Sequence, residues 1–151
     1  MTPDPRPDFT WAKLVPELIV ADLTASLRFY TGPCGFSLAF ERPETGFACV
    51  ERGGAQFMLE DERPSRWLTG PLERPLGRGL NFQIEVEDAV AIAEALAAAG
   101  WPLFRTLEEV WYRVGTRESG VRQFLVQDPD GYLLRFLEPI GSRVAIAGVR
   151  L

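Results

Sequence analysis

The 151-residue chain contains no histidine. Histidine titrates near neutral pH and is the commonest metal ligand among the side chains. Its absence excludes Ser-His-Asp and Cys-His nucleophile systems, HExxH zinc sites, histidine proton shuttles and every metal site that needs an imidazole.

Cysteine is almost as scarce, with only Cys34 and Cys49 present. Two thiols cannot build a four-thiolate metal site. A disulfide between them is allowed by their number, but free thiols are expected in a chain without a secretory signal. Because no histidine is present to activate either thiol, we expect both to be structural.

Long hydrophobic runs and an excess of basic residues are also missing. Residues Met1–Asp8 lack the apolar stretch of a signal peptide, and the richest apolar stretch, Ala89–Ala99, is interrupted by Glu94. Sixteen Lys and Arg against 21 Asp and Glu give a net charge of −5, which argues against a nucleic-acid partner. We therefore expect a cytoplasmic protein, without membrane or nucleic-acid partners, that forms one domain over residues 1–151.

What the chain does contain is one pattern of strands and helices that occurs twice. The first copy, residues 14–60, predicts a strand at Leu14–Val20, a helix from Asp22 to Tyr30, and strands at Phe36–Arg42, Phe47–Arg52 and Ala55–Glu60. Residues 61–78, rich in proline, glycine and arginine, are interpreted as a linker. The second copy, residues 79–139, predicts a strand at Leu80–Val86 and a helix at Ala89–Ala99 that is capped by Asp88. Four more strands are predicted at Leu103–Val110, Trp111–Arg117, Val121–Gln127 and Tyr132–Leu137. Leu103–Val110 and Trp111–Arg117 could instead form one long bulged strand.

The two copies align at a fixed offset. Val20 and Asp22 correspond to Val86 and Asp88, 66 residues later, whereas the closing strands lie 77 residues apart, so the second copy has a longer middle hairpin. We interpret this as an internal duplication. The predicted fold is α+β, with two βαβββ modules whose curved sheets meet about a pseudo-twofold axis.

Side chains alternate between the two faces of a strand, which separates the predicted core from the predicted site. The wholly apolar rows should pack on the helices, and the mixed rows should line a concave cleft that suits a small molecule. Three aromatic residues outside the helix-facing rows, Phe47, Trp67 and Trp111, are candidates for stacking on a ligand. The predicted ligand-binding residues are Glu17, Phe47, Met58, Glu60, Asn81, Gln83, Trp111 and Arg135.

Several motifs give the chain a family resemblance. They are Val20-Ala-Asp22-Leu-x-x-Ser26-Leu-x-Phe29-Tyr30, Gly35-Phe36, Val86-Glu-Asp88 and Gln123-Phe-Leu-Val-Gln-Asp128-Pro-Asp-Gly131-Tyr-Leu-Leu-Arg135-Phe136. Together they resemble the vicinal-oxygen-chelate superfamily, which includes glyoxalase I, extradiol dioxygenases, fosfomycin-resistance enzymes and bleomycin-resistance proteins. The resemblance covers residues 14–139.

The resemblance also implies where a metal would be held. Metal-dependent members place His or Glu at four strand positions, which here are Val15, Met58, Asn81 and Arg135. Valine has no donor, methionine offers only a thioether and arginine repels a cation, so we expect no metal and no other cofactor. The chain then resembles the metal-free bleomycin-resistance branch. That resemblance implies a homodimer that sequesters a small cationic or aromatic ligand without transforming it. It also implies a role for Phe47, which occupies the position where that branch carries a phenylalanine in its ligand-binding groove.

Three functions remain open at this point. The leading one is non-catalytic ligand sequestration. The alternative is a metal-independent isomerase or lyase that uses Glu17 or Glu60 as a base and Arg135 to hold an anionic intermediate. The third is a protein interface through Trp67 and Trp111. Glu17 and Glu60 would also serve as partners of Arg135 or as an exposed acidic wall, and we favour these readings over acid–base catalysis.

Overall fold

The computed structural model describes residues 8–63 and 67–146. These residues form two compact units. Unit 1 comprises residues 8–63 and 67–78 together with the turn 128–132, and unit 2 comprises residues 79–127 and 133–146. The turn 128–132 is therefore part of unit 1, although it follows unit 2 residues in the chain.

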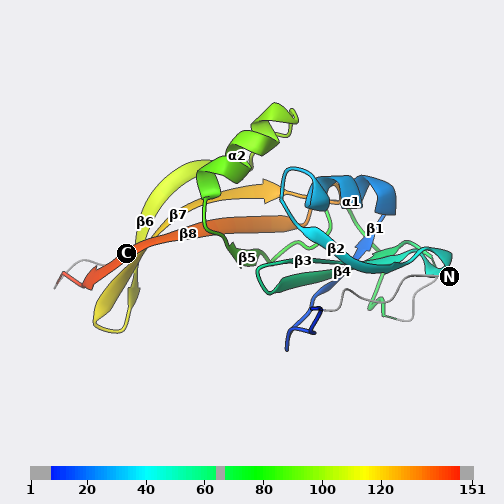
Figure 1. The fold of residues 1–151 in the computed structure, drawn as a ribbon, viewed down its shortest axis with the longest axis horizontal. Coiled ribbons are helices and arrows are strands. Elements are labelled where there is room, and N and C mark those ends of the chain that lie inside the picture. The colour runs from blue at the N-terminus through cyan, green and yellow to red at the C-terminus, as the bar shows by residue number, and fades with distance from the viewer. Residues whose placement is uncertain (1–7, 64–66, 147–151) are drawn as a thin grey trace. The chain divides into compact units, whose positions relative to one another are not determined.

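Unit 1 is a four-stranded mixed sheet covered on one face by a helix (Figure 1). The sheet has the order β1-β4-β3-β2, in which β1 pairs parallel with β4 and the other neighbours are antiparallel. Its elements are β1 (Glu17–Val20), α1 (Leu23–Thr31), β2 (Ser37–Arg42), a 3-10 turn (Pro43–Thr45), β3 (Phe47–Arg52) and β4 (Ala55–Asp61).

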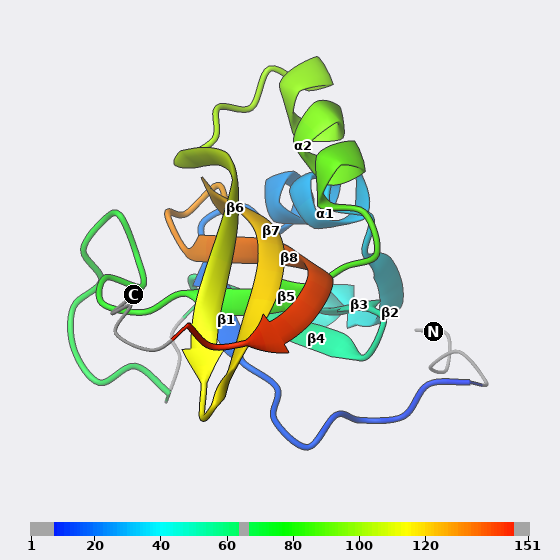
Figure 2. The same ribbon diagram turned by 90° about the vertical axis from the view of Figure 1, so that its left-hand side faces the viewer.

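Unit 2 repeats this arrangement with longer strands (Figures 1 and 2). Its sheet has the order β5-β8-β7-β6, and β5 again pairs parallel with β8. Its elements are β5 (Phe82–Glu85), α2 (Ala89–Ala98), β6 (Arg105–Val114), β7 (Arg117–Gln127) and β8 (Leu133–Val144). The duplicated βαβββ order and the predicted α+β class are thus confirmed.

Both helices begin where the sequence predicts. The carboxylates of Asp22 and Asp88 accept hydrogen bonds from the backbone N–H groups of Ala25 and Ala91, at 3.1 and 3.0 Å, as N-caps do. α1 buries Phe29 and Tyr30 against its sheet, and α2 buries a row of small and branched residues. No helix in the described part of the chain has the length and apolar character needed to cross a membrane.

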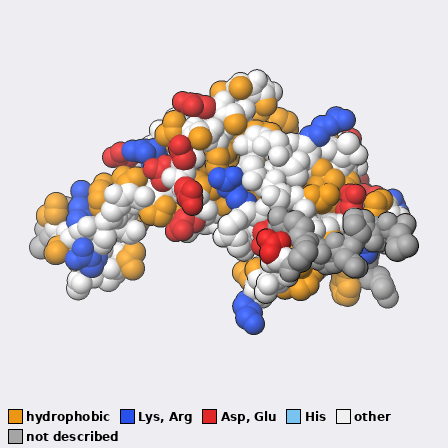
Figure 3. All heavy atoms as spheres, viewed as in Figure 1, with side chains coloured by type: hydrophobic (Ala, Val, Ile, Leu, Met, Phe, Trp, Pro, Cys, Tyr) orange, Lys and Arg blue, Asp and Glu red, His pale blue; other side chains and the backbone are white. Residues whose placement is uncertain are grey.

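The hairpin of unit 2 corrects the predicted strand boundaries. The predicted strands Leu103–Val110 and Trp111–Arg117 are one strand, β6, and Arg117 opens β7. The turn falls at Gly115 because this glycine adopts a positive φ of 64°, which other residues rarely take. β8 also continues beyond Leu137 to Val144, so the hairpin end of unit 2 extends beyond its helix, and Val114 and Val144 are exposed there. Figure 3 shows hydrophobic and basic side chains gathered at this end.

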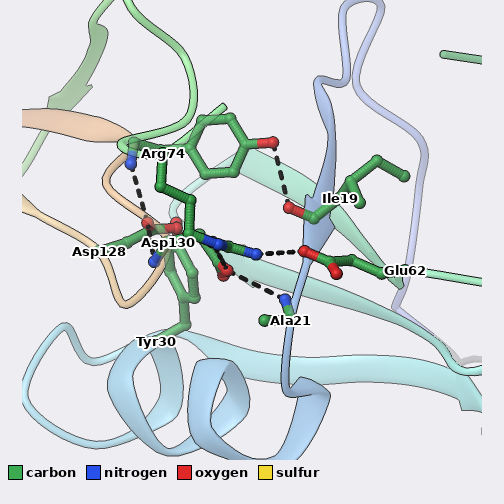
Figure 4. A network of polar contacts seen from close by, with 8 residues as sticks. Ile19, Ala21, Tyr30, Glu62, Arg74, Asp128 and Asp130 are labelled. Carbon is green, nitrogen blue, oxygen red and sulfur yellow. Dashed lines mark hydrogen bonds and ion pairs between the residues drawn. The ribbon is translucent and has the colours of Figure 1, made fainter. Parts of the chain in front are cut away.

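The turn Asp128–Tyr132 is anchored in unit 1 by buried polar contacts (Figure 4). The Tyr30 hydroxyl donates to Asp128 Oδ2 at 2.8 Å, and Asp128 Oδ1 accepts from the backbone N–H groups of Asp130 and Tyr132 at 2.9 Å each. The Tyr132 hydroxyl donates to the Ile19 carbonyl at 3.1 Å. The turn therefore supplies polar partners to the core of unit 1.

Asp130 connects the same turn to two other segments of unit 1. Its Oδ1 accepts from the Ala21 N–H at 2.9 Å and from Arg74 Nη1 at 2.6 Å, and its carbonyl accepts from the Leu76 N–H. Arg74 also pairs with Glu62. The segment predicted as a linker thus holds specific contacts, although none of its described residues beyond Asp61, where β4 ends, lies in a helix or strand.

We predict that Asp128 makes the stability of the fold depend on pH. Burial raises the pKa of this carboxyl from 3.8 to about 6, despite the hydrogen bonds that favour its charged form. A raised folded-state pKa contributes stability that is complete below about pH 4 and is lost as the pH rises through 6. The loss is at most about 3 kcal/mol. In Asp128→Asn, whose amide can still bond to Tyr30, urea unfolding between pH 4 and 7 should show a smaller decline, and the part that remains comes from Glu17, whose pKa is also raised.

Asp88→Asn is the matched control, because Asp88 is an exposed capping residue and Asn is an equally good N-cap. It should keep the decline seen in the unchanged protein. An Asp128→Asn variant with an undiminished pH dependence would contradict the assignment to Asp128.

Candidate functional site

The face of the unit 1 sheet that α1 leaves uncovered carries the predicted site residues of the first module. The register pairs Glu17 with Met58 and Phe47 with Glu60, so these four side chains share one face. Buried residues such as Phe57 and Leu59 alternate with Met58 and Glu60 along β4 and occupy the other face. The alternation therefore places these four residues on the face opposite the helix.

These four residues line one cavity of about 340 Å³, which we call the acid-pair pocket. Arg42, Thr45 and Trp67 complete its wall. Trp67 has an exposed fraction of 73%, so its indole offers a large apolar surface at the pocket. The pocket is at the lower end of the size range of ligand sites, which suits a small molecule or one end of a larger one.

Glu17 and Glu60 interact directly in this pocket. A hydrogen bond to Glu60, burial and the repulsion between the carboxylates raise the pKa of Glu17 from 4.5 to about 7, while Arg42 opposes the rise. Two neighbouring carboxyl groups behave in this way because one shared proton removes their repulsion. Glu17 is therefore close to half-protonated at neutral pH.

Phe47 is more enclosed than the sequence suggests. Only 5% of it is exposed, and the guanidinium carbon of Arg42 lies 3.9 Å from the centre of its ring. Ala39 and Cys49 pack beside it, with Phe9, Phe40 and Met58 at the edge of the cluster. Trp67 is thus the more exposed of the two aromatic rings that line the acid-pair pocket.

The segment before β1 also occupies this face, which the sequence reasoning missed. The Gln56 amide donates to the Thr10 carbonyl at 2.7 Å and accepts from the Ala12 N–H at 2.9 Å. Phe9 and Trp11 pack edge-on against Phe40, with ring centres 5.4 and 5.6 Å away. The two alternating aromatics Phe9 and Trp11 are the signal in the sequence that could have revealed this segment.

The uncovered face of the unit 2 sheet holds a separate cavity of about 310 Å³, which we call the arginine pocket. The register pairs Gln83 with Arg135, and Arg135 Nη2 donates to Gln83 Oε1 at 2.8 Å. The pocket is lined by Gln83, Glu85, Tyr112, Val114, Ser119, Val121, Arg135, Leu137 and Pro139. Gln83 and Arg135 are the predicted site residues that it brings together.

The two remaining predicted site residues lie outside both pockets. Asn81 is exposed and precedes β5. Trp111 neighbours Tyr112 along β6 and so points to the opposite face from the arginine pocket. Its indole covers the backbone at Gly120, and the guanidinium carbon of Arg143 lies 4.0 Å from its ring centre.

The residues at the four positions implied for a metal do not fit one. Val15, Met58, Asn81 and Arg135 together offer one amide oxygen, one thioether and a fixed positive charge, whereas divalent cations need several anionic or imidazole donors. Among the residues that the structure describes, no three His, Cys, Asp or Glu side chains are grouped so that they could hold an ion. Neither cysteine offers a thiolate readily, since both are buried, and burial raises the pKa of Cys34.

Comparison with known families agrees with this architecture. Residues 13–136 match the model of the Glyoxalase/Bleomycin resistance protein/Dioxygenase superfamily. The chain therefore belongs to this superfamily. A search of curated protein sequences found no match.

Solved structures share the fold at low sequence identity. TioX from Micromonospora sp. ML1 has a TM-score of 0.68 and 20% identity, over 87% of this chain and 100% of that chain. A glyoxalase/bleomycin resistance protein/dioxygenase from Alicyclobacillus acidocaldarius has a TM-score of 0.56 and 19% identity, over 85% and 91%. Lactoylglutathione lyase from Agrobacterium tumefaciens has a TM-score of 0.55 and 18% identity, over 88% and 96%.

We predict that Glu60→Gln lowers the pKa of Glu17 from about 7 toward 4.5, because the variant removes the carboxylate that hydrogen-bonds to protonated Glu17 and repels its charged form. A carbon-13 NMR titration of the Glu17 carboxyl would measure the shift. Glu44→Gln, an exposed change outside the pocket, should leave the titration unchanged. A Glu17 that titrates near 4.5 in the unchanged protein would show that the two carboxyls do not share a proton.

Proposed function

We propose that this chain is a metal-independent protein that binds and sequesters a small cationic or aromatic molecule in the acid-pair pocket. The observation that carries this proposal is the interaction of Glu17 with Glu60 in a cavity that also has an exposed tryptophan on its wall. The fold, the family and the unsuitable metal donors support the proposal.

The charges in the pocket favour a single positive charge on the ligand. With one shared proton, Glu17 and Glu60 carry about one negative charge, which Arg42 balances. A bound monocation would replace the proton, so that two carboxylates would then face two positive charges.

The wall of the pocket favours a planar, apolar body behind that charge. The Trp67 indole provides a surface on which an aromatic cation can stack, an arrangement that adds both dispersion and cation–π attraction. The bleomycin-resistance branch of the superfamily, which the motifs resemble, sequesters ligands of this type. A cytoplasmic homodimer, as in that branch, belongs to the same proposal.

Proflavine, a planar dye that stays cationic between pH 6 and 8, is a suitable probe. Its fluorescence anisotropy should rise saturably with protein, and the affinity should increase roughly tenfold from pH 6 to pH 8 as the shared proton leaves. Glu17→Gln and Glu60→Gln should each weaken binding at pH 8, and Trp67→Leu should weaken it at both pH values.

Glu44→Gln serves as the control for the loss of a negative charge elsewhere on unit 1. Its affinity should equal that of the unchanged protein. An equal proflavine affinity at pH 6 and pH 8 in the unchanged protein would count against Glu17 and Glu60 as the binding groups. An equal affinity in Glu17→Gln and Glu44→Gln would count against them as well.

The same pair favours one second candidate, a metal-independent isomerase or lyase. A carboxyl with a pKa of about 7 is suited to accept and return a proton at neutral pH, because general acid–base catalysis is most effective when the pKa lies near the working pH. If a substrate screen finds turnover, Glu17→Gln should reduce kcat by about 100-fold or more. An unchanged kcat would eliminate Glu17 as the base.

A further inference from the structure

Arg135 differs from three other arginines of unit 2 in what it pairs with. Arg105, Arg122 and Arg143 of unit 2 each pair with a glutamate carboxylate. Arg135 instead donates from Nη2 to the neutral amide of Gln83, and its Nε is buried without a hydrogen-bond partner among the described residues. A buried guanidinium N–H without a partner is costly, so this group is set up to receive an acceptor.

The cavity in front of this guanidinium combines polar and apolar walls. Gln83 and Arg135 form one part of the arginine pocket, and Val121, Leu137 and Pro139 provide apolar surface. Gln83 holds one end of the guanidinium in place and leaves other N–H groups for a ligand. We propose that the arginine pocket is a second binding site, which takes the carboxylate of a small organic acid with an apolar body.

Two hydroxyl groups on the wall fit a negatively charged ligand. Tyr112 and Ser119 are paired across β6 and β7 and both line the pocket. The Tyr112 hydroxyl accepts a hydrogen bond from Gln123 Nε2 at 2.7 Å, which leaves its own proton for a further acceptor. The Ser119 hydroxyl rotates freely to donate as well.

A carboxylate fits this pocket better than a phosphate. The planar guanidinium fork matches the two oxygens of a carboxylate, and Arg135 supplies a single positive charge. Glu85 lies on the same wall and would repel a dianion more strongly than a monoanion. The ligand therefore carries one negative charge, in contrast to the cation proposed for the acid-pair pocket.

Benzoate is the probe for this site, with neutral benzamide and inorganic phosphate as comparisons. In nitrogen-15 NMR spectra of the full chain, benzoate should shift the Arg135 Nε–H signal saturably, because a new acceptor changes its environment. Benzamide and phosphate should bind at least tenfold more weakly. Equal binding of benzoate and benzamide, or tighter binding of phosphate, would overturn the carboxylate assignment.

Variants separate the role of Arg135 from general charge effects. By calorimetry, Arg135→Gln should weaken benzoate binding at least tenfold, and Arg135→Lys should weaken it less, because lysine keeps the charge and loses the fork. Arg113→Gln, an exposed change outside the pocket, should have no effect, and Glu85→Gln should strengthen binding. Full-strength benzoate binding in Arg135→Gln, or weaker binding in Glu85→Gln, would contradict the proposal.

This site is independent of the proposed function in unit 1. Arg135→Gln should retain the pH-dependent response to proflavine, so failure of one site is distinguishable from failure of the other. If Arg135→Gln does not fold, as judged by circular dichroism, Arg135→Lys still decides the question. Benzoate affinity in Arg135→Lys equal to that of the unchanged protein would show that the guanidinium fork is not the binding group.

Discussion

The constraint on which the rest of this structure depends is that a strand presents its side chains alternately to two faces. In each unit one face of the sheet packs against a helix, and the residues on that face must be apolar and closely packed. The other face is released from that requirement. Glu17, Glu60 and Arg135, the charged residues to which we assign binding roles, all stand on this second face, each on a different strand.

The duplication makes the difference between the two free faces informative. Glu17 and Met58 are partners across the parallel strands of unit 1, and Gln83 and Arg135 are their counterparts in unit 2. The backbone arrangement is the same, but one copy concentrates carboxyl groups and the other a guanidinium. A metal ion would have imposed similar anionic donors on both copies. The residues at the implied metal positions do not suit a metal, and the corresponding positions of the two units carry different charges.

Local features of the sequence predicted most of the fold. The helix starts at Asp22 and Asp88 and the turn at Gly53-Gly54 depend on neighbours within a few residues, and they are found where the patterns place them. The division of strand residues into two faces also follows from local alternation. Of the two alternatives for residues 103–117, the single bulged strand is correct, because no turn residue stands between Val110 and Trp111, whereas Gly115 provides the conformation that the hairpin needs.

Features that depend on distant residues escaped prediction. Phe47 was correctly assigned to the uncovered face, but its cover by Arg42 depends on pairing between strands and on side-chain direction. The proton shared by Glu17 and Glu60 requires two strands in a particular register. The sequence Asp128-Pro-Asp-Gly131 predicted a turn, yet the hydrogen bond from Tyr30 to Asp128 joins residues 98 positions apart, and no short-range pattern could indicate it.

Because of that turn, the first module cannot be separated from the second without losing part of unit 1. A duplicated gene first yields two self-sufficient copies, each of which could in principle be inherited alone. Here unit 1 includes five residues encoded near the end of the second copy, Asp128–Tyr132, of which Asp128, Asp130 and Tyr132 are buried. A fragment that stops at Arg78 would leave the hydroxyl of Tyr30 and the N–H of Ala21 without their acceptors. The first module thus depends on residues that lie within the second, so it is not a transferable part on its own.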